Sequence, residues 1–213
     1  MLQKIGNLKA YLKNLDIFLG VFFIAVFIVS GFVYIQQGWW YEFFWLSNHW
    51  ALINGIAFLA RSRFLFSYIV SLVIIPELFW IVDFVFMLNG HHLFGITNYW
   101  FDQNYPYVLK IIALQHLFNP FASIYGIARF GFHRKAWIGA FTHGIIIGLA
   151  SLYFFDKTLN VNCVWKNCMT SIPMPDFVWR VFLVSAMILH VLSINYLMVL
   201  VSKTTSHRLV ACH

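Results

Sequence analysis

The sequence predicts an all-α integral membrane protein with six transmembrane helices and both termini in the cytoplasm. The first observation is composition: 62% of the 213 residues are hydrophobic and only 10% are charged, whereas a soluble domain has about 25% charged residues. The second is that apolar segments of about 20 residues, the length that crosses a bilayer, fill most of the chain. The third is the placement of basic residues between these segments. No room is left for a soluble domain, so residues 1–213 form a single domain.

The six predicted helices cover residues 17–35, 43–60, 66–88, 107–128, 137–155 and 177–201. A basic lead-in precedes the first helix, and no small-residue cleavage site follows it, so we expect a retained helix rather than a signal peptide. The aromatic residues Trp39 and Trp40 after it suit a membrane interface. The third helix is interrupted by Pro76. Pro106 and Pro175 lie where the fourth and sixth helices begin, a position that proline favours.

Basic residues predict the orientation of the chain. Ten of the 14 fall on one side in a six-span arrangement: Lys4, Lys9, Lys13, Arg61, Arg63, Arg129, Arg134, Lys135, Lys203 and Arg208. The other four lie at or near the opposite side: Lys110, Lys157, Lys166 and Arg180. The positive-inside rule then places the basic side and both termini in the cytoplasm of a plasma or inner membrane. The net charge of +7 suits anionic lipid headgroups, and no clustered basic face indicates nucleic-acid binding.

Two of the three cysteines, Cys163 and Cys168, lie close together in a polar loop on the predicted outer side. An oxidising compartment permits a disulfide between them, and two free thiols are the alternative. The spacing without further ligands does not indicate a zinc site.

Polar residues interrupt the apolar segments, above all in residues 110–123, KIIALQHLFNPFAS. Gln115, His116 and Asn119 fall within the fourth predicted helix, where polar side chains need partners from neighbouring helices. Further polar residues in or beside the predicted spans are Ser47, Asn48, His49, Glu77, Asp83, His143 and His190. Ser, Asn and His commonly hydrogen-bond between helices as packing contacts. An ionisable residue at the midplane, such as Glu77 or His116, indicates a functional site instead.

Two chemistries can be built from these residues. In the first, Ser47 is a nucleophile, His116 is its general base, and Asn48 or Asn119 donates to a developing oxyanion. Glu77 or His190 would orient His116 from a neighbouring helix. In the second, histidines ligate a metal or haem, since imidazole suits iron, copper and zinc. The candidate ligands for this second chemistry are His49, His116, His143 and His190, which lie at different depths in the membrane.

Two segments resemble a known family. WLSNHWALINGIAFLARSRFLF (45–66) and IIALQHLFNPFASIYGI (111–127) are similar to helices of the YwaF-like six-helix membrane proteins, and TLNVNCVW (158–165) is similar in place to a short loop segment of that family. The resemblance implies that Ser47 falls at the nucleophile position and His116 on the family histidine. The wider superfamily includes the androgen-induced-gene lipid-ester hydrolases and a branch implicated in acyl transfer to ether phospholipids.

The leading interpretation is an intramembrane acyl hydrolase or acyltransferase that acts on a lipid ester through Ser47 and His116, without a metal or other cofactor. Membrane lipid is then both its environment and its substrate. The first alternative is a non-catalytic membrane protein whose polar cavity binds or passes a small solute or lipid. The second alternative is the histidine-ligated metal or haem protein.

Overall fold

The computed structural model describes the backbone of residues 2–210 and the side chains of residues 10–201, and this part of the chain is helical without a strand. The α-helices are α1 (Leu2–Gln36), α2 (Leu46–Ala60), α3 (Arg63–Leu88), α4 (Asn98–Phe101), α5 (Tyr107–Ala113), α6 (Gln115–Phe130), α7 (Ala136–Phe154) and α8 (Asp176–Val210). Two 3₁₀ helices, η1 (Trp40–Phe44) and η2 (Val161–Cys163), lie in the connections. The all-α expectation is confirmed for the described residues.

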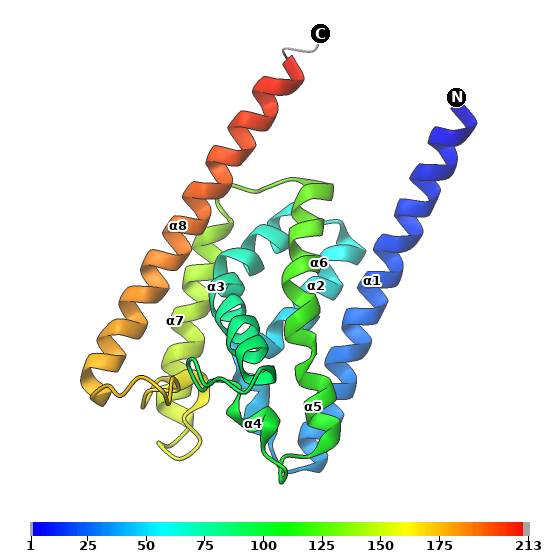
Figure 1. Ribbon diagram of the computed structural model, residues 1–213. Helices are drawn as coiled ribbons and strands as arrows, with labels where there is room; N and C mark the ends of the chain where they lie inside the picture. Colours follow the sequence, from blue (N-terminus) through cyan, green and yellow to red (C-terminus); the bar gives the residue numbers. More distant parts are fainter. Residues whose placement is uncertain (1, 211–213) are drawn as a thin grey trace.

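Helix α3 occupies the centre of the bundle and contacts α2, α6, α7 and α8, while α1 packs along α2. Figure 1 shows α1 and α8 on opposite flanks, with the start of α1 and the end of α8 at the same end of the bundle. We call this the basic end, because Arg61, Arg63 and the 131–135 connection also lie there. The two long connections, 89–106 and 155–175, lie at the opposite end.

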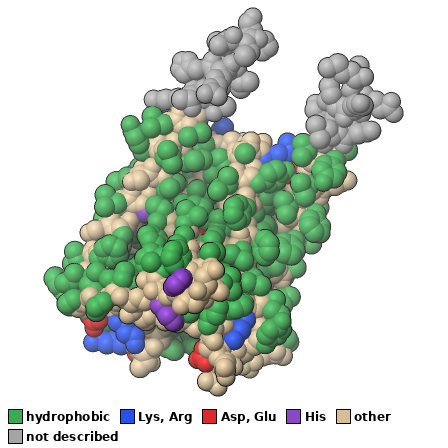
Figure 2. Space-filling model, in the orientation of Figure 1, with side chains coloured by type: hydrophobic (Ala, Val, Ile, Leu, Met, Phe, Trp, Pro, Cys, Tyr) green, Lys and Arg blue, Asp and Glu red, His purple; other side chains and the backbone are tan. Residues whose placement is uncertain are grey.

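Five segments of the described chain are long and apolar enough to cross a membrane. They are Ala10–Gln36, Arg63–Leu88, Tyr107–Phe130, Ala136–Phe154 and Asp176–Val201. Figure 2 shows hydrophobic side chains over the middle of the visible face, with charged side chains gathered toward its two ends. Within α8 only 11% of the apolar window is buried inside the protein. Such an apolar exterior needs a lipid environment, so the chain is a membrane protein.

Glycine allows α1 and α2 to lie in close contact. A Cβ atom on Gly20 would lie 2.7 Å from the Leu59 side chain, and one on Gly55 would lie 2.6 Å from Ile24 Cγ1. Small residues drive this type of packing in membranes, where van der Waals contact replaces the hydrophobic effect between helices. The close approach sets α2 antiparallel to α1.

The second predicted span differs from the structure at its start. The expected helix begins at residue 43, whereas α2 begins at Leu46, after the 3₁₀ turn η1 and the extended residue Trp45. Side chains replace the helical N–H groups at this break: Asn48 Nδ2 donates to the Glu42 carbonyl (2.7 Å), and Asn162 Nδ2 donates to the Phe44 carbonyl (2.6 Å). These bonds stabilise the break in apolar surroundings, because each backbone group without a hydrogen bond there costs several kcal/mol.

The fourth predicted span is broken at Leu114, directly before Gln115 and His116. Leu114 accepts and donates only i→i+3 bonds, so α5 ends at Ala113 and α6 begins at Gln115. Pro120 lies four residues after His116 and lacks the N–H that would bind the His116 carbonyl. The polar residues of this span therefore lie at an irregular turn. The other predicted boundaries lie within three residues of the observed ones, except that α1 begins earlier and α8 ends later.

A disulfide joins Cys163 to Cys168 in the connection between α7 and α8, so the structure has the bridged form of the two alternatives. The same connection places Asn162 at the start of α2, where its Oδ1 accepts from Leu46 N at 2.9 Å. Cys212 lies outside the described residues. The bridged loop thus supplies the cap of a helix more than 100 residues earlier in the sequence.

The buried carboxylate of Asp83 holds the 89–106 connection against α3. Oδ1 accepts from Phe94 N (2.7 Å) and Gly95 N (3.1 Å), and Oδ2 accepts from Thr97 N and Thr97 Oγ1, both at 2.8 Å. Asp83 and Thr97 are both 0% exposed. A carboxylate satisfied by four donors has a structural role here, which explains its place in an otherwise apolar helix.

We expect Asp83→Ala to destabilise the protein by about 3 kcal/mol or more, because three backbone N–H groups would lose their acceptor at about 1 kcal/mol each. Thermal unfolding in detergent should show a midpoint lower by about 6 °C or more, and limited proteolysis should cut first within residues 89–106. Asp156→Asn is the matched control, since Asp156 binds only its own turn at Thr158 and Leu159. Equal stability of the two variants would contradict the structural role of Asp83.

Candidate functional site

His116 and Glu77 form the centre of the candidate site. The His116 Nδ1 atom lies 2.5 Å from Glu77 Oε2, and the two residues are only 8% and 2% exposed. Short N–H···O contacts of this kind involve charged partners and are stronger than neutral ones. His116 Nε2 has no hydrogen-bond partner among the described residues. The carboxylate therefore fixes the ring and leaves one nitrogen free for a ligand or a proton.

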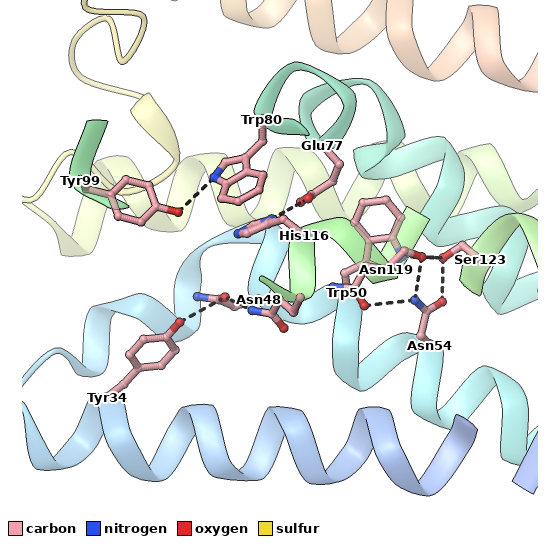
Figure 3. A network of polar contacts seen from close by, with 11 residues as sticks. Tyr34, Asn48, Trp50, Asn54, Glu77, Trp80, Tyr99, His116, Asn119 and Ser123 are labelled. Atoms are coloured by element: carbon pink, nitrogen blue, oxygen red, sulfur yellow. Dashed lines mark hydrogen bonds and ion pairs between the residues drawn. The ribbon is translucent and has the colours of Figure 1, made fainter. Parts of the chain in front are cut away.

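The His116 ring also stacks on Trp80, with ring centres 4.6 Å apart. Trp80 Nε1 donates to the Tyr99 hydroxyl at 3.0 Å, so the connection that Asp83 anchors also contacts the site. Figure 3 shows this order, from Tyr99 through Trp80 to the His116 and Glu77 pair. The ring position is thus constrained on its face as well as at Nδ1.

Asn48 and Gln115 form a second polar contact beside His116. Gln115 Nε2 donates to Asn48 Oδ1 at 3.1 Å, and the Tyr34 hydroxyl approaches the same oxygen at 3.5 Å. Together with Phe43 these residues line a crevice in which no water-sized sphere fits (≈ 0 Å³). Glu42, in η1, is a second residue with a carboxyl group near His116.

Ser47 lies half-buried on the first turn of α2, and its hydroxyl makes no hydrogen bond to a described residue. The expected bond from Ser47 to His116 is not formed, and His116 Nδ1 contacts Glu77. Of the two residues expected to orient His116, Glu77 and His190, it is Glu77 that contacts the His116 ring. The nucleophile and the base are therefore present without contact in this structure.

Asn119 belongs to a separate buried cluster rather than to the surroundings of His116. Its Oδ1 accepts from Asn54 Nδ2 at 3.4 Å, and Ser123 Oγ donates to Asn54 Oδ1 at 2.7 Å and accepts from Trp50 Nε1 at 2.5 Å. Figure 3 shows this cluster apart from the His116 ring. The Asn48 amide is likewise committed to the Glu42 carbonyl. The Asn119 Nδ2 atom is buried without a hydrogen-bond partner, but it lies in this separate cluster, which joins α2 to α6, rather than beside the His116 ring.

His49 and His143 form a third polar group, with Tyr68. His49 Nε2 lies 2.6 Å from the Phe43 carbonyl, His49 Nδ1 lies 3.1 Å from His143 Nε2, and the Tyr68 hydroxyl contacts His143 Nδ1. We call Tyr68, His143 and His49 the inner chain. It joins α3, α7 and α2.

The four histidines of the proposed metal set do not come together. His116 pairs with Glu77, His49 pairs with His143, and His190 on α8 contacts none of them, with its Nε2 buried and without a partner. Within the described residues, no three His, Cys, Asp or Glu side chains are grouped as metal ligands. The histidines therefore form hydrogen-bonded pairs, which can exchange protons, rather than a group that could bind one metal ion.

Several contributing residues were not singled out from the sequence. They are Tyr68, Trp80, Tyr99 and Glu42. The available signal was position: Tyr68 lies five residues into α3, about 8 Å from its start, deeper than an interface residue. Its partner His143 comes 75 residues later in the chain, so only the fold shows the pairing.

No family model, no curated protein and no solved structure matches the chain. The argument for function therefore rests on the geometry of the site.

We expect strong coupling between Glu77 and His116. Removal of one partner leaves the other buried without its partner, at a cost of about 3–5 kcal/mol, whereas removal of both avoids that cost. Thermal unfolding of Glu77→Leu, His116→Phe and the double variant should show the double variant more stable than the sum of the single changes. The corresponding cycle on Glu77 and Ser123, which do not touch, is the control. Additive effects of Glu77→Leu and His116→Phe would show that the short contact carries no energetic coupling.

Proposed function

We propose that the chain crosses the membrane six times, with both termini on the cytoplasmic side. Residues 40–60, which comprise η1, Trp45 and α2, form the remaining span beside α1. Their length is about 20 residues, which a bilayer requires, and the side-chain bonds to η1 carbonyls satisfy the break. The basic residues at the ends of α2, α3 and α6 then lie on the cytoplasmic side.

We infer that the polar interior of this bundle binds or passes a small solute. The observation that carries this proposal is the Glu77 and His116 pair, 2.5 Å apart and almost completely buried, with His116 Nε2 unoccupied. Ionisable groups at membrane depth are costly and mark ligand or proton pathways. The crevice beside the pair is closed to water-sized spheres, so passage of any solute requires the surrounding helices to open.

Cysteine accessibility tests this function. In a background with Cys212→Ser, we expect Ser47→Cys to react with a membrane-impermeant methanethiosulfonate reagent added from outside, because Ser47 borders the site. Ser123→Cys is the matched control, because it makes the same change at a residue that is 0% exposed and should not react. A mass shift measured on intact protein from native membranes gives the readout. Equal protection of both cysteines would mean that the interior does not open to water, and the proposal would fail.

A second candidate is the lipid-ester hydrolase or acyltransferase with Ser47 as the nucleophile. It is favoured by the orientation of His116, whose Nδ1 is held by a carboxylate while Nε2 remains free to take a proton, as in nucleophile activation by a base. The resemblance to YwaF-like proteins points the same way and stays a prediction. Catalytic contacts are often long before substrate binds, so this candidate requires Ser47 to approach Nε2 on substrate binding.

A serine-reactive fluorophosphonate probe tests this candidate in native membranes. Labelling of the wild type that is lost in both Ser47→Ala and His116→Ala would establish an activated serine. Ser123→Ala should keep the label, because Ser123 lies in the separate Asn54 cluster. Labelling that persists in Ser47→Ala would exclude Ser47 as the nucleophile.

A further inference from the structure

The inner chain has a defined hydrogen-bond direction. A carbonyl oxygen only accepts, so His49 Nε2 must carry the proton that points to the Phe43 carbonyl. In neutral His49, Nδ1 is then an acceptor, and His143 Nε2–H donates to it. Nδ1 of neutral His143 is likewise an acceptor, so the Tyr68 hydroxyl donates to it. Three donors therefore point the same way, from Tyr68 toward η1.

Adding one proton reverses the chain. If the Tyr68 oxygen receives a proton, its own proton passes to His143 Nδ1, and the proton on His143 Nε2 passes to His49 Nδ1. His49 becomes an imidazolium that holds the added charge, while Tyr68 and His143 stay neutral. The three groups are thus connected for proton transfer without any movement of heavy atoms, over contacts of hydrogen-bond length.

Acceptors lie near both ends of the inner chain. At the outer end, His49 Nε2 binds the carbonyl of Phe43, and Glu42, with its carboxyl group, is the preceding residue of the same turn. At the basic end, the Phe64 ring packs against both Tyr68 and His133, and His133 Nδ1 is buried without a hydrogen-bond partner. An unpartnered buried nitrogen beside the end of the chain is a site for a bridging water or proton.

We propose that Tyr68, His143 and His49 form a proton relay that carries protons between His133 at the basic end and Glu42 at the outer end of the bundle. This rests on the proposed function and identifies the small solute as the proton. Each passage ends when the His49 imidazolium releases its Nε2 proton to the Glu42 carboxylate or to water. The Nε2 lone pair then faces the Phe43 carbonyl oxygen, and this repulsion favours rotation of the two imidazole rings. Rotation turns the N–H groups, now on Nδ1, toward η1 and so restores the original direction of the chain.

Few other ionisable groups face the relay. On α6 and α3, His116 and Glu77 pair with each other. On α8, His190 has its Nε2 buried without a partner. Glu42 in η1 and His133 in the 131–135 connection are the groups assigned to the two ends of the relay. Because no arginine, lysine or carboxylate contacts His49 or His143 within the described residues, the added charge on the relay has no fixed counterion, which favours its rapid release.

Proton flux into proteoliposomes tests the relay. Purified protein is reconstituted with an internal pH dye, and a potassium gradient with valinomycin drives protons inward. We expect the wild type to exceed protein-free vesicles, and Tyr68→Phe and His143→Gln each to reduce the excess flux at least tenfold. Tyr68→Phe keeps the ring and removes only the hydroxyl, so its fold is preserved. His190→Gln is the matched control, a buried histidine outside the relay, and should keep the flux.

Glycerol swelling of the same vesicles separates the two proposals. Wild-type proton flux no higher than that of empty vesicles, or full flux in Tyr68→Phe, overturns the relay. If glycerol permeability nevertheless exceeds that of empty vesicles, passage of a small solute stands and only its identification as the proton falls. If neither flux exceeds that of empty vesicles, the transport function falls with the relay.

Discussion

The pairing of polar groups inside an apolar environment is the constraint on which this structure depends. Three consecutive carbonyls of η1, those of Glu42, Phe43 and Phe44, are bound by the side chains of Asn48, His49 and Asn162. In water such a break costs little, because solvent binds the exposed groups. In lipid each unpaired group costs several kcal/mol. Three side chains therefore stabilise the break, in addition to the bond from Trp45 N to the Glu42 carbonyl, and these same side chains bring the polar networks together.

Much of the fold was predictable from hydropathy and charge, because lipid imposes both directly. Helix lengths, the all-α class and the starts after Pro106 and Pro175 follow from that constraint. The start of α2 was wrong, because Asn162 caps Leu46 from 116 positions away, and such a cap leaves no local pattern. The polar centre was partly predictable: His116 and Glu77 were singled out by depth, and Glu77 was one of two expected partners. The expected contact of Ser47 with His116 is not formed, because depth along two helices does not show whether their side chains face each other.

Burial alone does not distinguish a functional polar residue from a structural one. Asp83 is as buried as Glu77, yet its carboxylate is saturated by four donors. Ser123 and Asn54 likewise satisfy each other and Trp50 between α2 and α6. The Nδ2 of Asn119 in that cluster and the Nε2 of His190 are nevertheless buried without a partner, so an unsatisfied polar atom does not by itself mark a site either. His116 combines an ionisable ring, a buried carboxylate at Nδ1 and an Nε2 atom without a protein partner. The useful criterion is therefore this combination rather than polarity at depth.

The segment η1 connects the surroundings of His116 to the inner chain. The Glu42 carbonyl binds Asn48, which in turn binds Gln115 beside His116, while the Phe43 carbonyl terminates the chain through His49 and His143. A displacement of η1 would break contacts in both groups together, because adjacent carbonyls of one short turn cannot move independently. Glu42 lies on the same turn, near His116. Any movement of this turn therefore acts on the surroundings of His116 and on the end of the inner chain together.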